Sequence, residues 1–240
     1  MISKNILQSF ISKYYLNGNF SQVKWRVEDN TLTVYAGGGG KACKVYLNNF
    51  SFENCELGIF DTQKLSKLIS ITNGELMLTP DKINEVYTKL NIADSNFDLS
   101  YSLADIFVIP KVDYFHQIEE PDAQFDLEGE NIEALIKAKN ALSDQSNLLV
   151  KTTKDLDGNN VCEFIFGDIE DFSNKVTYTL QGEINVTDLE LPFNSDVLKD
   201  IFTANKDMTS GKLKLLAEGM MQINFYSDEI ESEYFILRNE

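Results

Sequence analysis

The side chains that could carry out acid–base or nucleophilic chemistry are few in this sequence. His116 is the single histidine, and it lies in a polar segment with no second imidazole in the chain to act with it. A lone histidine in such a segment is typical of a solvated loop, because proton relays and histidine metal clusters need further partners. We therefore expect no catalytic role for His116.

A cluster of carboxylates offers a second route to acid–base or metal chemistry. Asp168, Glu170 and Asp171 lie close together in a polar segment of an acid-rich chain. Without burial, nothing shifts the pKa of such carboxyl groups to a value useful for catalysis. A hydrolase would need one of them buried in a cleft, so we predict that the chain is not an enzyme and holds no cofactor or metal.

Two short motifs resemble ligand-binding loops but depart from them at necessary positions. Residues 37–42 read Gly-Gly-Gly-Gly-Lys-Ala, whereas a phosphate-binding loop needs glycine where Tyr35 stands and serine or threonine where Ala42 stands. Residues 155–159 read Asp-Leu-Asp-Gly-Asn, with glycine in the fourth place rather than the sixth place of a calcium loop. Both segments are predicted to be turns between strands.

The composition indicates a folded and strongly acidic protein. The chain has 240 residues, of which 43% are hydrophobic, and its 38 acidic against 21 basic side chains give a formal net charge of −17. This length allows one large domain or two medium ones. The charge disfavours a nucleic-acid binder with an open basic face and a binder of anionic membranes. Any contact with DNA must therefore be local or topological.

The cysteines and the N-terminal segment indicate where the chain resides. Cys43, Cys55 and Cys162 are odd in number and fit no zinc-ligand spacing, which favours a reducing compartment. The sequence begins without a basic region followed by an apolar core, and no apolar stretch approaches the length of about 18 residues that a membrane span requires. We expect a soluble cytoplasmic protein that does not bind membranes.

Hydrophobic periodicity predicts helices and antiparallel strands in the first half of the chain. Apolar residues recur at helical spacing over residues 2–15 and at alternate positions between residues 23 and 47. A second helix is predicted over residues 61–71, with Asp61 as its N-cap. Further strands are predicted at residues 76–78, 87–92, 97–103 and 106–111.

The same order of elements begins again in the second half. Helices are predicted from Asn131 and from Asn194, and aligning the halves places Lys13 opposite Lys139. This correspondence indicates a tandem duplication in an α+β fold, each domain having two helices on one face of antiparallel sheet. The second group of strands is predicted at residues 148–153, 161–166, 176–180, 184–189, 212–217, 221–226 and 234–237. The domains are placed at residues 1–111 and 127–240, joined by a linker at residues 112–126.

Positive charge is concentrated in the four predicted helices. These carry eight lysines against four acids, whereas the rest of the chain is acidic. Lysine is common on exposed helix faces, but a bias shared by four helices makes these faces the one place where the protein tolerates a polyanion. The lysines are Lys4, Lys13, Lys64, Lys67, Lys137, Lys139, Lys199 and Lys206.

Five stretches in order along the chain carry a family resemblance. They are Leu-Gly-Ile-Phe-Asp at residues 57–61, the segments 102–110 and 175–183, Leu-Pro-Phe-Asn at 191–194, and Gly-Lys-Leu-Lys-Leu-Leu at 211–216. Together they resemble the sliding clamps, specifically the DNA polymerase processivity factors of tailed myoviruses, which are relatives of proliferating cell nuclear antigen. In such clamps each domain presents two helices to a central hole, and three two-domain subunits close a ring.

The resemblance implies a function and a set of partners. The homotrimer would encircle duplex DNA without sequence preference, with the eight helix lysines facing the channel, and would be opened by an ATP-dependent clamp loader in the cytoplasm of an infected host. The replicative DNA polymerase would dock at the apolar linker residues Val112, Tyr114 and Phe115. The aromatic pair could equally anchor the linker onto its own sheet.

A second class of function fits the same composition. An acidic phage structural or adaptor protein built from duplicated β-rich domains would also carry lysines on its helices. There the lysines would be ordinary solvated side chains and would contact no nucleic acid.

Overall fold

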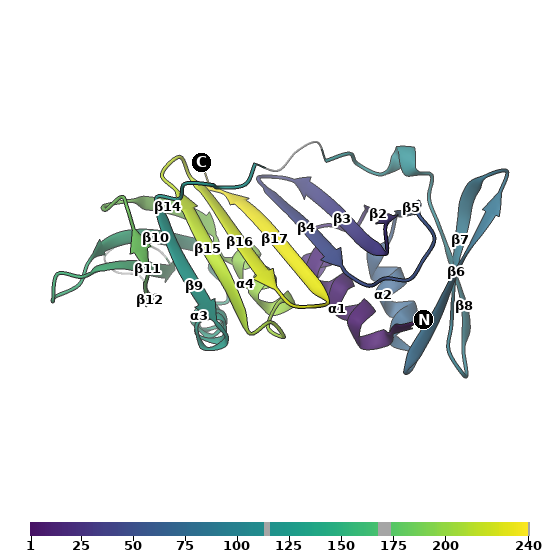
Figure 1. Ribbon diagram of the computed structural model, residues 1–240. Coiled ribbons are helices and arrows are strands. Elements are labelled where there is room, and N and C mark those ends of the chain that lie inside the picture. Colours follow the sequence, from purple (N-terminus) through teal and green to yellow (C-terminus); the bar gives the residue numbers. More distant parts are fainter. Residues whose placement is uncertain (113–115, 168–173, 240) are drawn as a thin grey trace. The chain divides into compact units, whose positions relative to one another are not determined.

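The chain forms two compact units, each with two helices among its described residues (Figure 1). The computed structural model describes residues 1–112, 116–167 and 174–239. The first unit comprises Met1–Gly37, Cys43–Tyr114 and Ser227–Ser232, and the second comprises Gly38–Ala42, Phe115–Tyr226 and Glu233–Glu240.

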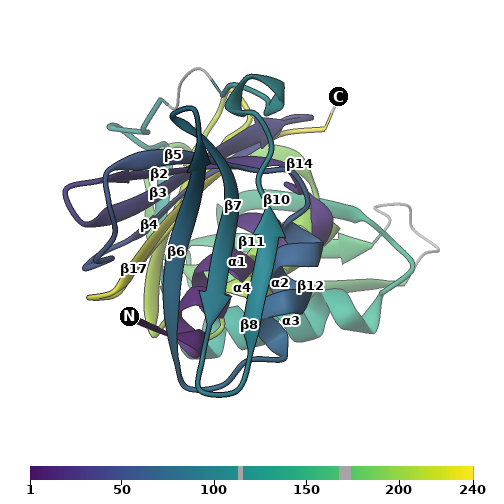
Figure 2. The same cartoon turned by 90° about the vertical axis from the view of Figure 1, so that its right-hand side faces the viewer.

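The first unit packs helices α1 (Lys4–Tyr15) and α2 (Thr62–Ser70) against two sets of antiparallel strands. One set is a sheet in the order β1-β6-β7-β8, and the other runs in the order β4-β3-β2-β5. Figure 2 shows β6, β7 and β8 side by side in front of α1 and α2. The strands are β1 (Ile2–Ser3), β2 (Val23–Glu28), β3 (Thr31–Gly38), β4 (Lys41–Leu47), β5 (Cys55–Ile59), β6 (Glu75–Ile83), β7 (Val86–Ala93) and β8 (Asp98–Ser102).

The second unit repeats this arrangement around α3 (Gly129–Ala141) and α4 (Ser195–Ala204). Its order β12-β11-β10-β14 corresponds to β4-β3-β2-β5, and β9-β15-β16-β17 corresponds to β1-β6-β7-β8. The predicted duplication and α+β fold class are therefore confirmed. The strands are β9 (Ala123–Glu128), β10 (Asn147–Lys154), β11 (Asn160–Gly167), β12 (Lys175–Gln181), β13 (Glu183–Ile184), β14 (Glu190–Asn194), β15 (Ser210–Leu216), β16 (Met220–Tyr226) and β17 (Ile230–Leu237).

The core of the first unit forms where the apolar stripe of α1 meets the inward side of β2. Phe10 and Tyr14 recur one helical turn apart, and both pack with Trp25, all three being fully buried. The indole N–H of Trp25 donates to the Tyr14 hydroxyl at 3.2 Å, which satisfies both buried polar groups. The apolar residues predicted to alternate between residues 23 and 47 are the buried, inward-facing side chains of β2, β3 and β4.

Equivalent side chains begin the second helix of each unit. The carboxylate of Asp61 accepts from the backbone N–H of Lys64 at 2.8 Å. The side-chain oxygen of Asn194 accepts from the N–H groups of Asp196 and Val197 at 2.9 and 3.2 Å. The predicted N-cap Asp61 and the predicted helix start at Asn194 are confirmed, and each side chain accepts from backbone donors that have no partner inside the helix.

The two motifs rejected as ligand loops are turns, as predicted. Residues Gly39 and Gly40, at φ of 59° and 73°, join β3 to β4. Asp155 begins the turn between β10 and β11, where its carboxylate accepts from the side chain and backbone of Asn159 and from the Asp157 N–H. These hydrogen bonds lower the pKa of Asp155 below its ordinary value, and the bond from the Asn159 side chain has the largest effect.

Several predicted boundaries were wrong. Residues 106–111 form no strand, because the Asp105 carboxylate accepts from the Phe107 N–H at 2.9 Å and starts the 3-10 turn Ile106–Val108. Strand β9 begins at Ala123, inside the predicted linker, because the alternation of Ala123, Phe125 and Leu127 buries its inward side. The predicted strand 184–189 is replaced by β13 and β14, and α3 begins at Gly129, not Asn131.

Removing either N-cap tests this account of how the second helices start. We expect Asp61→Ala and Asn194→Ala each to lower the free energy of unfolding by about 1 kcal/mol, because one helix N–H group in the first variant and two in the second then depend on water. Urea denaturation followed by circular dichroism measures the change. Asn194→Asp keeps an acceptor and should cost less than Asn194→Ala. Equal losses in the two Asn194 variants would contradict the capping role.

Candidate nucleic-acid interface

Two helices lie side by side in each unit and expose the faces that do not pack into the core. Helix α1 packs beside α2, and α3 packs beside α4. The polar residues between the buried positions of these helices form the outward faces. A polyanion that meets these helices therefore contacts only the side chains left on these faces.

Helix α2 exposes two lysines and no acidic side chain. Lys64 and Lys67 are both exposed and one helical turn apart, with Gln63 and Ser70 as exposed neighbours. The helix contains no acidic residue, and neither lysine forms an ion pair with a carboxylate in the described part of the chain. These two ammonium groups are therefore available to an anionic partner.

The two lysines predicted on α1 serve the fold. The ammonium group of Lys4 donates to the carbonyls of Ser70 and Thr72 at 2.8 and 2.5 Å, at the C-terminal end of α2, where carbonyls lack helical partners. Lys13 has 0% of its surface exposed. The prediction that Lys13 points outward is wrong, whereas Lys4 is half-buried and its ammonium group is already bonded to two carbonyls.

Lys139 on α3 is also buried, so its predicted outward position is wrong. It is 1% exposed, and its ammonium group donates to the carbonyls of Leu142, Ser143 and Gln145 at 3.3, 3.3 and 2.6 Å. The same group forms an ion pair with Asp196 at 3.0 Å. The turn after α3 therefore obtains its hydrogen-bond donors from a helix side chain.

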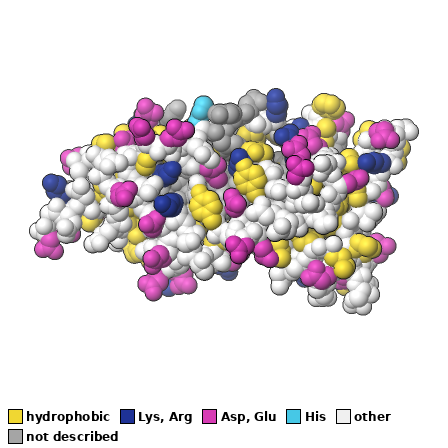
Figure 3. Space-filling model, viewed as in Figure 1, with side chains coloured by type: hydrophobic (Ala, Val, Ile, Leu, Met, Phe, Trp, Pro, Cys, Tyr) yellow, Lys and Arg dark blue, Asp and Glu magenta, His cyan; other side chains and the backbone are white. Residues whose placement is uncertain are grey.

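The other three predicted lysines, all in the second unit, differ in exposure and pairing. Lys137 is exposed but paired with Glu133 at 3.1 Å, Lys199 is half-buried, and Lys206 is exposed just beyond the end of α4 at Ala204. Because α3 starts at Gly129, it also includes the acid Glu130, and α4 contains Asp196 and Asp200. The excess of positive charge predicted for these helices is therefore absent. Figure 3 views the side on which β3, β4 and β15–β17 lie in front in Figure 1, and acidic side chains are spread over that side as well.

The predicted partner site is described only at its first residue. Val112 lines a cavity of about 170 Å³ together with Phe20, Tyr35, Ala36 and Pro110. Aromatic, aliphatic and proline side chains in a small hollow can hold an apolar anchor of a partner. Tyr114 and Phe115 lie outside the described residues, so their part in this site stays a prediction.

The structure describes His116 and the three cysteines. His116 is exposed. Burial raises the pKa of Cys55 to about 11 and that of Cys162 to about 12, and it also raises the pKa of Cys43, so all three are protonated at neutral pH. No group of metal-ligating side chains occurs in the described ranges. The carboxylates at positions 168, 170 and 171 fall outside them.

Substituting Lys139 and Lys137 in turn compares a buried lysine with an exposed one on the same helix. We expect Lys139→Met to destabilise the chain by about 3 kcal/mol, because three carbonyls and Asp196 lose their donor in a buried site. Lys137→Met, on the same helix but exposed, should change stability by less than about 0.5 kcal/mol. Urea unfolding of both variants measures the difference. Equal midpoints would show that the Lys139 contacts contribute nothing.

Comparison with known proteins identifies the fold. The sequence matches no known protein family and no curated protein. Among solved structures, the chain is similar to proliferating cell nuclear antigen from Entamoeba histolytica, with a TM-score of 0.75 at 13% identity over 99% of this chain and 96% of that one. No helix in the described residues is long and apolar enough to cross a membrane. The similarity to that solved structure shows that the chain has the fold of proliferating cell nuclear antigen, a sliding clamp, along nearly its whole length.

Proposed function

We propose that three copies of this chain close into a ring around duplex DNA and tether a replicative DNA polymerase to it. The observation that carries the proposal is the clamp fold, which extends over nearly all of both chains in the comparison. The duplicated order of helices and strands supports it, because each copy then supplies two equivalent units to a ring. Origin in a tailed phage and a place in the host cytoplasm stay predictions.

Two unpaired strand edges support assembly into a ring. Strands β8 and β12 stand at the ends of their sheets, with one neighbouring strand each among the described residues. The Leu103 N–H donates to the Thr88 carbonyl on the β7 side, so alternation directs the backbone groups of Ser100 and Ser102 away from β7. Pairing β8 of one copy with β12 of the next is a head-to-tail contact that closes by rotation.

The distribution of lysines supports loose contact with DNA. Within the helices as the structure bounds them, Lys64 and Lys67 are exposed and have no ion pair in the described residues, so a trimer would present six such groups on α2. Lys206, just beyond the end of α4, is a further exposed lysine without an ion pair there. Few phosphate contacts on an acidic ring hold duplex weakly, which suits a tether that slides. Loading onto closed DNA would need an ATP-dependent partner that opens the ring.

One observation favours the alternative function as an acidic structural or adaptor protein. The helices of the second unit expose more acids than lysines, as expected where helix lysines are only solvated side chains. In that case the α2 lysines would have no role in any DNA-dependent activity. The two experiments below separate the alternatives.

Blocking the edge of β8 tests the ring. We expect Ser100→Pro to yield a folded monomer, because proline removes an outward N–H while the bonds from β8 to β7 remain. Sedimentation equilibrium should give a mass near three times 27.2 kDa for the wild-type chain and for Ser100→Ala. A wild-type chain that stays monomeric at high concentration would contradict the ring. A Ser100→Pro variant that stays trimeric would contradict pairing of subunits through the edge of β8.

Reversing the α2 charges tests the contact with DNA. We expect Lys64→Glu with Lys67→Glu to reduce processive primer extension about tenfold or more at moderate salt, because six contacts per ring become repulsive. The variant should remain trimeric, since both side chains are exposed. Lys89→Glu with Lys154→Glu makes the same charge change on exposed strand residues and should leave extension unchanged. Full processivity of a trimeric α2 variant would favour the adaptor alternative.

A further inference from the structure

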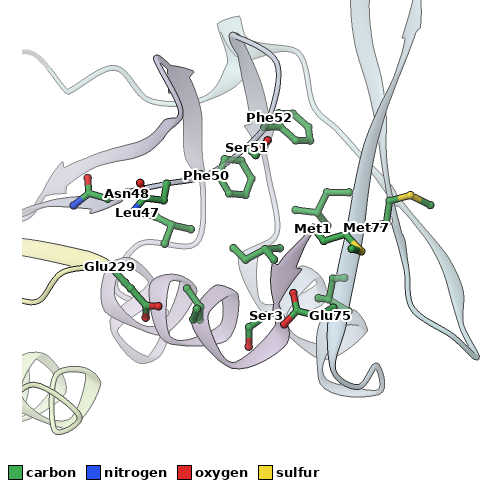
Figure 4. A pocket seen from close by; sticks show the side chains of 15 residues that line it. Met1, Ser3, Leu47, Asn48, Phe50, Ser51, Phe52, Glu75, Met77 and Glu229 are labelled. Carbon is green, nitrogen blue, oxygen red and sulfur yellow. The ribbon is translucent and has the colours of Figure 1, made fainter.

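The first unit contains a cavity that the proposed function does not use. It has a volume of about 300 Å³ and lies where the segment Asn48–Phe52 faces β1 and the start of β6 (Figure 4). Figure 4 shows Leu47 and Phe50 on one side of it, and Met1 and Glu75 on the other. All of its lining residues belong to the first unit.

The lining of this cavity combines an apolar cluster with polar side chains. Phe50 and Phe52 stack with their ring centroids 5.3 Å apart, and Leu47 and Leu76 are buried. Met1 is 87% exposed at the opening. An aromatic pair with a flexible methionine beside it can enclose an aliphatic side chain of a partner.

An unpaired strand edge runs along the same cavity. Strand β1 covers β6 only at Glu75 and Leu76, and no described strand pairs with the following residues on that side. The Lys4 N–H donates to the Gly74 carbonyl, so alternation directs the backbone N–H and carbonyl of Leu78 toward the same free edge. Leu78 also lines the cavity, and an extended peptide could add there as a continuation of β1.

The charge of the cavity selects the chemistry of that peptide. Glu75 and Glu229 line it, both are exposed, and neither forms an ion pair within the described ranges. No lysine or arginine lines it. Figure 4 places the two carboxylates on different sides of the opening, so basic residues on either side of an apolar one would each meet a carboxylate.

We propose that this cavity binds an extended peptide of a partner protein, in which an apolar side chain flanked by basic residues enters beside Phe50 and the peptide backbone pairs with Leu78. The free edge supplies backbone hydrogen bonds, the apolar lining holds the anchor, and Glu75 and Glu229 select for basic flanks. This binding does not depend on ring formation or on DNA, since every group involved lies in the first unit.

Fluorescence anisotropy with labelled peptides tests the proposal. We expect a peptide of alternating lysine and leucine to bind saturably, and peptides of alternating glutamate and leucine or lysine and serine to bind at least about tenfold more weakly. Glu75→Lys with Glu229→Lys should weaken the lysine–leucine peptide about tenfold or more. Glu218→Lys with Glu130→Lys makes the same change of charge at exposed positions outside the cavity and should leave the affinity for the lysine–leucine peptide unchanged.

The role of the strand edge is tested from both partners. Leu78→Pro removes the outward N–H, as Pro80 already does two residues later, and should abolish saturable binding. If that variant unfolds, a lysine–leucine peptide N-methylated at alternate residues removes the same pairing from the ligand and should not bind the wild-type chain. Equal binding of the N-methylated peptide, or of the glutamate–leucine peptide, would overturn the proposal. A change in sedimentation mass in Glu75→Lys with Glu229→Lys would also overturn it, because the occupant would then be a second copy of this chain.

Discussion

The backbone groups at the ends of the helices must find hydrogen-bond partners, and this requirement determines which charges remain available at the surface. Asp61 and Asn194 supply acceptors at two helix starts. Lys4 donates to the carbonyls that end α2, and Lys139 donates to three carbonyls of the turn after α3. Lysines that would otherwise make the helices basic are therefore part of the framework, because an unpaired buried carbonyl is costly.

The elements that hydrophobic periodicity defines could be predicted from the sequence. The four helices, the alternating strands and both N-caps follow from local patterns that tertiary packing does not reverse. The turn at Ile106–Val108 could not, because the apolar residues 106–109 satisfy a strand pattern and only the Asp105 side chain decides the conformation. The start of β9 was missed because the acids and proline before it hide a short alternation.

The candidate site was predictable in its location but not in its individual side chains. Lysine side chains in folded proteins are usually exposed, yet the long aliphatic stem can be buried when the ammonium group donates to carbonyls. Lys13 and Lys139 occupy corresponding positions of the duplication, and both are buried. That recurrence indicated a structural role in the sequence, since a side chain kept in both halves of a diverged repeat serves a property that the halves have in common. The two halves have the fold in common, whereas the charge of their outward helix faces differs.

The difference between the two helix pairs has a physical consequence for a ring on DNA. In a chain of net charge −17, the unpaired exposed lysines of α2 make a small positive area on an acidic background. Salt screens charges beyond about 8–10 Å, so duplex inside a ring responds to the nearest side chains more than to the total charge. Balanced charges on α3 and α4 add little attraction. Retention would then come from closure of the ring, and the weak local attraction would leave the duplex free to slide.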